Sequence, residues 1–77
     1  MLKLMIADTA EEIRQGLEAL FRERCVVRSC ADGETALELL RQFGPDILVL
    51  DLMLPKTDGL SVLQQLRQWQ MPTMVLA

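Results

Sequence analysis

The chain has 77 residues, of which 51% are hydrophobic and 25% are charged, and its formal net charge is −3 at pH 7. This length allows one small domain, and the composition is that of a folded globular core and not of a disordered segment. The Lys and Arg residues are scattered, whereas a nucleic-acid surface needs clustered ones, so we expect no nucleic-acid contact by this segment.

The cysteines and the amino terminus exclude several further classes. Cys25 and Cys30 are the only cysteines and histidine is absent, so neither a zinc finger nor a disulfide framework is expected. We interpret both as reduced thiols of a cytoplasmic protein. The apolar residues 1–7 are too few to span a membrane and lack the features of a signal peptide, so no membrane contact is expected.

The first half of the chain predicts two strands and two helices. Residues 2–7 are a nearly continuous apolar run that ends at Asp8, which predicts a buried strand. Apolar residues then recur at helical spacing between residues 10 and 21, with Asp8 and Thr9 as the expected caps. Residues 25–31 predict a second, more polar strand, and a turn at 32–33 leads into the second helix.

The second half repeats this alternation. Gly44 and the proline that follows end the second helix, and the apolar run 47–50 predicts a third strand that leads directly to Asp51. A loop over 52–59 precedes a third helix, and residues 74–76 open a fourth strand. The third helix is predicted to turn four side chains toward the core: Leu60, Leu63, Leu66 and Trp69.

This order predicts an α/β fold with a parallel sheet and helices on both of its faces. The polar second strand belongs at an edge, which fits a flavodoxin-like, doubly wound sheet of order 2-1-3-4-5. Because the sequence stops at Ala77, before any fifth strand, we expect a sheet truncated after strand four and a chain that is part of a longer protein. The apolar fourth strand would then be an exposed edge, open to homodimer formation or swapped association.

Two acids follow strands that lie next to each other in this order. Ligands of open parallel sheets bind beyond the carboxyl ends of the strands, so Asp8 and Asp51 are expected side by side at one rim. Two adjacent carboxylates repel, and Mg²⁺ relieves such a pair because it binds one or two carboxylates together with water and phosphate oxygens. A helix cap or a solvated loop residue is the alternative, and it is stronger for Asp8 than for Asp51.

Residues 51–59 (DLMLPKTDG) carry a specific resemblance. They resemble the phosphoacceptor segment of the response-regulator receiver domains of two-component signalling, which have a CheY-like fold. The family pattern is an acceptor aspartate, a hydrophobic residue two positions later, proline at plus four and glycine at plus eight, and Asp51, Met53, Pro55 and Gly59 match it. The resemblance covers the whole chain, as the first two-thirds of a receiver domain over residues 1–77.

The resemblance implies a role for each of these residues. Asp51 would accept a phosphoryl group from a histidine kinase and would bind Mg²⁺ directly, together with the backbone carbonyl of Met53. Asp8 would act on the metal through water, while Pro55 and Gly59 would shape the loop. The domain would then be a signalling phosphoacceptor and not an enzyme, and it would switch an output domain whose nature, DNA-binding or other, the sequence does not give.

The chain departs from the family in three ways. The family places two acids in succession after the first strand, whereas Asp8 is followed by Thr9, so we expect weaker Mg²⁺ binding. The switch serine or threonine would be at Ala77 or just beyond it, and the lysine at the end of a fifth strand is not in this sequence. Neither Lys3 nor Lys56 is placed to replace that lysine, so we expect inefficient phosphorylation of residues 1–77 alone.

Two alternatives to the phosphoacceptor remain open. A pseudo-receiver would keep the fold as an interaction module with weakened metal and phosphoryl chemistry, and Thr9 gives this reading some support. A haloacid-dehalogenase-type phosphatase would need a second acid two residues after Asp51, where the chain has Met53. Arg14 is interpreted as a surface charge.

Overall fold

All 77 residues are described by the computed structural model of the chain, and strands alternate with helices along its full length. The elements are β1 (Leu2–Ala7), α1 (Glu11–Phe21), β2 (Cys25–Cys30), α2 (Gly33–Phe43), β3 (Ile47–Leu50), α3 (Gly59–Gln68) and β4 (Met74–Leu76). None of the helices is long and apolar enough to cross a membrane.

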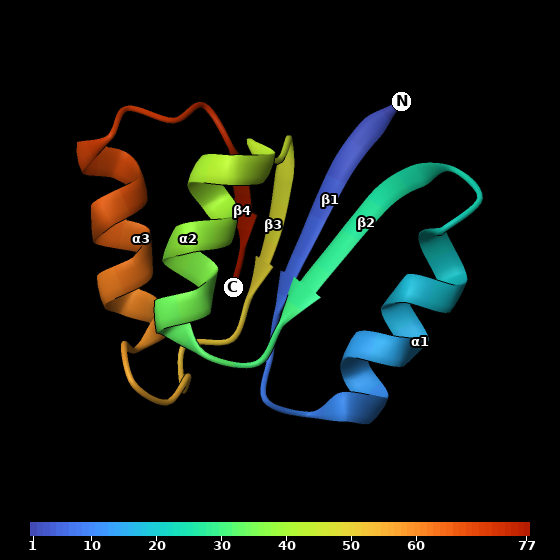
Figure 1. The fold of residues 1–77 in the computed structure, drawn as a ribbon, viewed down its shortest axis with the longest axis horizontal. Helices are drawn as coiled ribbons and strands as arrows, with labels where there is room; N and C mark the ends of the chain where they lie inside the picture. The colour runs from blue at the N-terminus through green and yellow to red at the C-terminus, as the bar shows by residue number, and fades with distance from the viewer.

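The strands form one parallel sheet of order β2-β1-β3-β4, which confirms the predicted topology with β2 at an edge. In the register of this sheet, Ala7 lies beside Cys30 on one side and beside Leu50 on the other. The carboxyl ends of the strands therefore meet at a common rim, which lies at the bottom of Figure 1. We call this edge the carboxyl rim.

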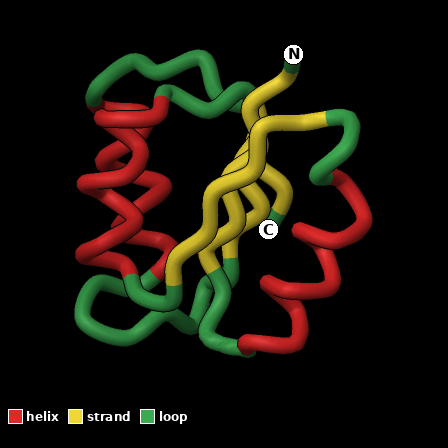
Figure 2. Tube along the Cα trace, turned by 45° about the vertical axis from the view of Figure 1, so that its right-hand side comes forward, coloured by secondary structure: helices red, strands yellow, loops and turns green.

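The two faces of the sheet are covered unequally. Figure 2 shows α2 and α3 on one side of the sheet and α1 alone on the other. The buried core lies on the side of α2 and α3, whereas α1 contains no buried residue. The cluster on this side consists of Met5, Ala7, Cys30, Ala36, Leu40, Leu48, Leu50, Leu54, Val62 and Leu66, and Leu4 and Ile6 of β1 are buried as well.

The prediction for the core face of α3 was partly wrong. Leu66 is fully buried as expected, but Leu60 is 55% exposed and Val62 is buried in its place. The helix begins at Gly59, and residues three and seven positions later fall on the same face as this buried glycine. Leu60 lies about 100° around the helix from Gly59, so its side chain turns toward solvent.

The predicted caps of α1 were also wrong. Ala10 occupies the position before the helix and offers no side-chain cap, while Asp8 lies too early in the chain to reach the first turn. The sequence did not predict the side-chain caps that α2 and α3 do have. The carboxylates of Asp32 and Asp58 accept the backbone N–H groups of Thr35 and Ser61, each at 2.7 Å, at the starts of α2 and α3.

Candidate functional site

The structure brings Asp8 and Asp51 together at the carboxyl rim, as the sequence predicted. The N–H of Asp51 donates to the carbonyl of Ala7 at 2.9 Å, and the N–H of Asp8 donates to the carbonyl of Cys30 at 3.1 Å. The hydrogen-bond ladder thus continues one residue past each strand. Neighbouring strands are about 4.8 Å apart, so the two acids begin side by side, and both are half-buried.

Local turns orient both carboxylates. Oδ1 of Asp51 accepts the N–H of Met53 at 2.9 Å, and Oδ1 of Asp8 accepts the N–H of Ala10 at 2.8 Å. In both, the aspartate carboxylate accepts the backbone N–H two residues later, which fixes the side chain to its own turn. The second oxygen of each carboxylate makes no protein hydrogen bond and is available to a ligand.

The loop from Leu52 to Asp58, which we call the acceptor loop, is held at its middle and at its end. Leu54 is only 6% exposed and anchors the loop to the core. The carbonyl of Pro55 accepts two N–H groups, from Gly33 at 3.1 Å and from Thr57 at 2.9 Å. The side chain of Met53 is 84% exposed, so at this position the backbone and not the side chain is the candidate ligand.

Gly59 closes the acceptor loop against its own beginning. Its N–H donates to the carbonyl of Leu52 at 3.0 Å. A Cβ at this position would lie 2.6 Å from the Cα of Leu52 and closer still to the carbonyl oxygen of Asp51. The family resemblance implied that Gly59 shapes the loop, and the structure shows a close approach of two backbone segments at this residue.

Arg14 belongs to the surroundings of the site, which the sequence analysis missed. Its Nη1 donates to the carbonyls of Asp8 at 2.8 Å and Thr9 at 3.1 Å, and the side chain is half-buried. An arginine in the first turns of the helix after β1 can reach back to the loop that precedes it, and this spacing was the available signal. Its positive charge lies beside the loop that carries Asp8, and it opposes the binding of a cation there.

The residues at the rim are of the types that can hold a magnesium ion. The carboxylates of Asp8 and Asp51 and the carbonyl of Met53 are oxygen donors, which Mg²⁺ prefers, and the ion commonly keeps several waters. No group of three or more Asp, Glu, Cys or His side chains converges anywhere in the structure. Thr9 is exposed and contributes no carboxylate, so the site has two acids only.

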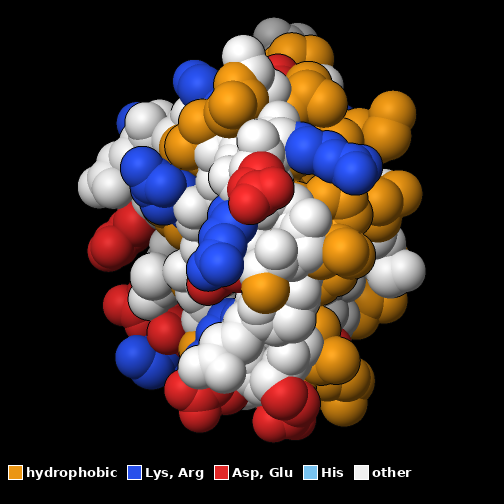
Figure 3. Space-filling view, turned by 90° about the vertical axis from the view of Figure 1, so that its right-hand side faces the viewer, with side chains coloured by type: hydrophobic (Ala, Val, Ile, Leu, Met, Phe, Trp, Pro, Cys, Tyr) orange, Lys and Arg blue, Asp and Glu red, His pale blue; other side chains and the backbone are white.

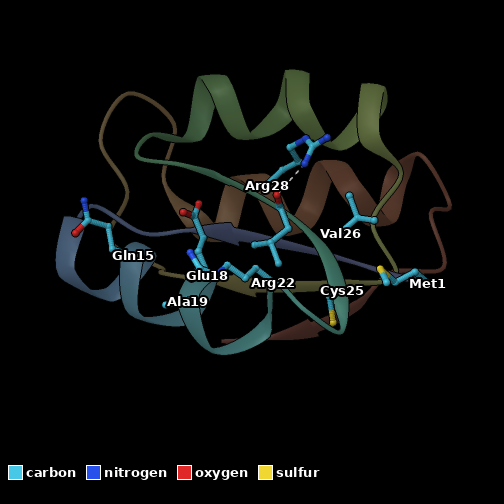
Figure 4. Close-up of a pocket in the computed structure, with 9 residues that line it drawn as sticks. Met1, Gln15, Glu18, Ala19, Arg22, Cys25, Val26 and Arg28 are labelled. Carbon is cyan, nitrogen blue, oxygen red and sulfur yellow. Dashed lines mark hydrogen bonds between the residues drawn. The ribbon is translucent and has the colours of Figure 1, made fainter.

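The largest hollow of the molecule, of about 600 Å³, lies away from the carboxyl rim. It is a concavity between α1 and the edge strand β2, lined by Glu18, Arg22, Cys25 and Arg28 among others (Figure 4). The carboxylate of Glu18 already accepts the hydroxyl of Ser29. None of the residues that line this hollow lies at the carboxyl rim, so the hollow is separate from the candidate site.

The chain matches a known protein family. The sequence profile of the response regulator receiver domain matches residues 4–77. The chain belongs to this family. As a receiver domain it is a module of two-component signalling, and its flavodoxin-like sheet agrees with that assignment.

Individual relatives show how far the similarity extends. The transcriptional regulatory protein AfsQ1 of Streptomyces coelicolor is 40% identical over 78 residues, which cover 99% of this chain and 35% of that protein. A protein-glutamate methylesterase/protein-glutamine glutaminase of Nitratidesulfovibrio vulgaris is 33% identical and is covered over only 21% of its length. The receiver domain of the Francisella response regulator 1452 superposes with a TM-score of 0.88 at 33% identity, over 97% of this chain and 63% of that one.

Proposed function

We propose that this receiver domain accepts a phosphoryl group on Asp51 from a histidine kinase, with Mg²⁺ held by Asp8, Asp51 and the carbonyl of Met53. The single observation that carries the proposal is the placement of Asp8 and Asp51 on adjacent strand ends, each with one carboxylate oxygen free of protein hydrogen bonds.

The transfer needs no other nucleophile. As an oxygen of the Asp51 carboxylate bonds to phosphorus, the bond from phosphorus to the imidazole nitrogen of a phosphohistidine breaks, and its electron pair remains on that nitrogen. The product at Asp51 is an acyl phosphate. Bound Mg²⁺ neutralises the charge on the phosphoryl oxygens in such a transfer.

The surrounding residues hold the nucleophile in position. The Met53 N–H fixes Oδ1 of Asp51, which leaves the other oxygen for attack or for the metal. The tight contact of Gly59 with Leu52 keeps the first turn of the acceptor loop against the rim. The carbonyl of Pro55 faces the start of α2, where it accepts the N–H of Gly33, so Pro55 and Gly59 support the site by shaping the acceptor loop.

The proposal extends to the whole protein and its partners. The chain spans 35% and 21% of the two curated relatives described above. We propose that these residues form the first part of a receiver domain in a cytoplasmic protein, and that phosphorylation biases an output domain. The name of the Streptomyces relative favours transcriptional control as that output.

A pseudo-receiver is the second candidate, and the number of acids at the rim favours it. Thr9 stands where a second acid of the pocket would be, and Arg14 brings a positive charge to the same loop. Such a domain would keep the fold and bind partners without phosphoryl chemistry.

Phosphorylation by acetyl phosphate distinguishes the two candidates. We expect slow, Mg²⁺-dependent addition of one phosphoryl group, detected by mass spectrometry, and its loss in Asp51→Asn. Asp46→Asn is the matched control, because Asp46 precedes β3 and lies at the amino ends of the strands, opposite the carboxyl rim. If neither acetyl phosphate nor beryllofluoride modifies or binds the full-length protein in the presence of Mg²⁺, while its fold is intact, the pseudo-receiver is the better account.

A further inference from the structure

The start of α2 contacts the acceptor loop through backbone atoms, without an intervening side chain of α2. Gly33 is the first residue of α2, it is buried, and its N–H donates to the carbonyl of Pro55 in the middle of the loop at 3.1 Å. A Cβ built on Gly33 would overlap the backbone carbonyl of Thr57 and would lie 2.9 Å from the Cβ of the same residue. A side chain at position 33 therefore cannot coexist with the acceptor loop as it stands.

Opposite charges lie on the two sides of this contact. Asp32 caps α2 through the N–H of Thr35, and this hydrogen bond is the main reason that the pKa of Asp32 lies below its ordinary value. The positive charge of Lys56, in the acceptor loop, acts in the same direction. Lys56 itself has a φ of 70°, a left-handed conformation that ordinary residues adopt only when their surroundings hold them there.

We propose that Gly33 is a positioning residue for the metal and phosphoryl site. Because Gly33 has no side chain, the acceptor loop can pack against the start of α2, and this contact determines where the loop places Asp51 and the carbonyl of Met53. This inference rests on the proposed function, because the geometry it concerns is that of the Mg²⁺ site.

A short, continuous stretch of backbone connects the contact at Gly33 with Asp51 and Met53. Gly33 contacts the loop at Pro55 and Thr57, and the other end of the loop is fixed by the contact of Gly59 with Leu52. Gly59 holds the far end of the loop close to Leu52, and Pro55 lies two residues from Met53, so we expect a displacement of the loop at Pro55 to change the backbone around Met53. The N–H of Met53 holds the Asp51 carboxylate.

Substitution at Gly33 tests the proposal in the protein as it stands. In Gly33→Ala we expect the amide resonances of Asp51 and Met53 to shift and the Mg²⁺ affinity, measured by titration, to fall on the order of 10- to 100-fold, the range for residues that orient metal ligands. Gly16→Ala is the matched control, because nothing lies within 4 Å of a Cβ at Gly16 in α1. It should leave the resonances and the affinity unchanged.

The outcomes separate this proposal from the proposed function. A folded Gly33→Ala variant that binds Mg²⁺ as tightly as the unmodified chain overturns the positioning role and leaves the phosphoacceptor standing. Failure of the unmodified chain to bind Mg²⁺ overturns both.

A measurement on the unmodified chain covers the case in which Gly33→Ala does not fold. Mg²⁺ should then slow hydrogen exchange at the Gly33 amide, which donates to the loop, and leave the amide of Gly44 at the far end of α2 unaffected. Protection at Met53 without any change at Gly33 would overturn the positioning role.

Discussion

At the scale of single residues, the site is defined by which polar atoms remain free. Asp32 and Asp58 are committed to helix caps, whereas Asp8 and Asp51 each keep one unbound carboxylate oxygen at the carboxyl rim. The sequence located the two rim acids, because each directly follows an apolar strand. It could not locate the contact of Arg14 with the Asp8 carbonyl, which depends on the side chain turning back from α1.

The missing second acid at position 9 gives a prediction about affinity. Thr9→Asp adds a carboxylate to the loop that carries Asp8, and an added charged ligand strengthens the binding of a hard cation. We expect Mg²⁺ to bind about tenfold more tightly, or about 1.4 kcal/mol, by calorimetric titration. Thr9→Asn, which adds a polar group without charge, should not produce this gain. Equal affinities for the Asp variant and the unmodified chain would contradict the account.

At the scale of elements, the alternation of apolar runs and helical segments was enough to predict the strands and their order. The third and fourth strands begin and end where the sequence placed them. The facing of α3 was harder, because Leu60, Val62, Leu63 and Leu66 are all apolar and several stripes are compatible with the sequence. The choice between them depends on where Gly59 packs, which is a tertiary contact.

The orientation of α3 can be tested with two leucines of the same helix. Leu66 is fully buried and Leu60 is 55% exposed. Leu66→Ala should lower the free energy of unfolding by about 2–5 kcal/mol, as for other buried leucines. Leu60→Ala should change it by less than about 0.5 kcal/mol. Urea denaturation measures both, and equal losses would show that the helix faces the sheet differently.

The cap of α3 makes the stability of this element depend on pH. The hydrogen bond from the N–H of Ser61 is the main cause that lowers the pKa of Asp58 below its ordinary value of 3.8. The folded state therefore favours the charged form, and this contribution is present above pH 3.8 and is lost as the pH falls below it. Asp58→Asn keeps an acceptor but cannot titrate. The difference in unfolding free energy between the two proteins should shrink on acidification, and parallel pH profiles would contradict this.

At the scale of the whole molecule, one face of the sheet is only partly covered. In Figure 3, hydrophobic side chains gather along the right-hand side of the view, while the charged ones lie mainly elsewhere. An entirely apolar groove between α1 and the sheet is lined by Leu2, Leu4, Leu17, Phe21, Cys25, Ile47, Val49 and Leu76. The edge strand β4 adds Met74, which is 61% exposed, and Leu76, which is 52% exposed.

This surface predicts self-association of residues 1–77. An unpaired apolar edge strand is a template for pairing with another chain. We expect the sedimentation coefficient to rise with protein concentration, and Leu76→Lys to reduce this dependence because it places a charge at the edge. Leu52→Lys is the control, because Leu52 is also exposed (45%) but lies at the carboxyl rim. Monomers at every concentration would contradict the prediction.

Paramagnetic relaxation is the most direct test of whether Asp8 and Asp51 form one cation site. Mn²⁺ accepts the same oxygen ligands as Mg²⁺ and broadens nearby amide signals. We predict that Mn²⁺ first removes the signals of Asp8, Asp51 and Met53, that excess Mg²⁺ restores them, and that Asp51→Asn abolishes the effect. Broadening centred on Asp46 at the opposite edge, or broadening that persists in Asp51→Asn, would contradict the account.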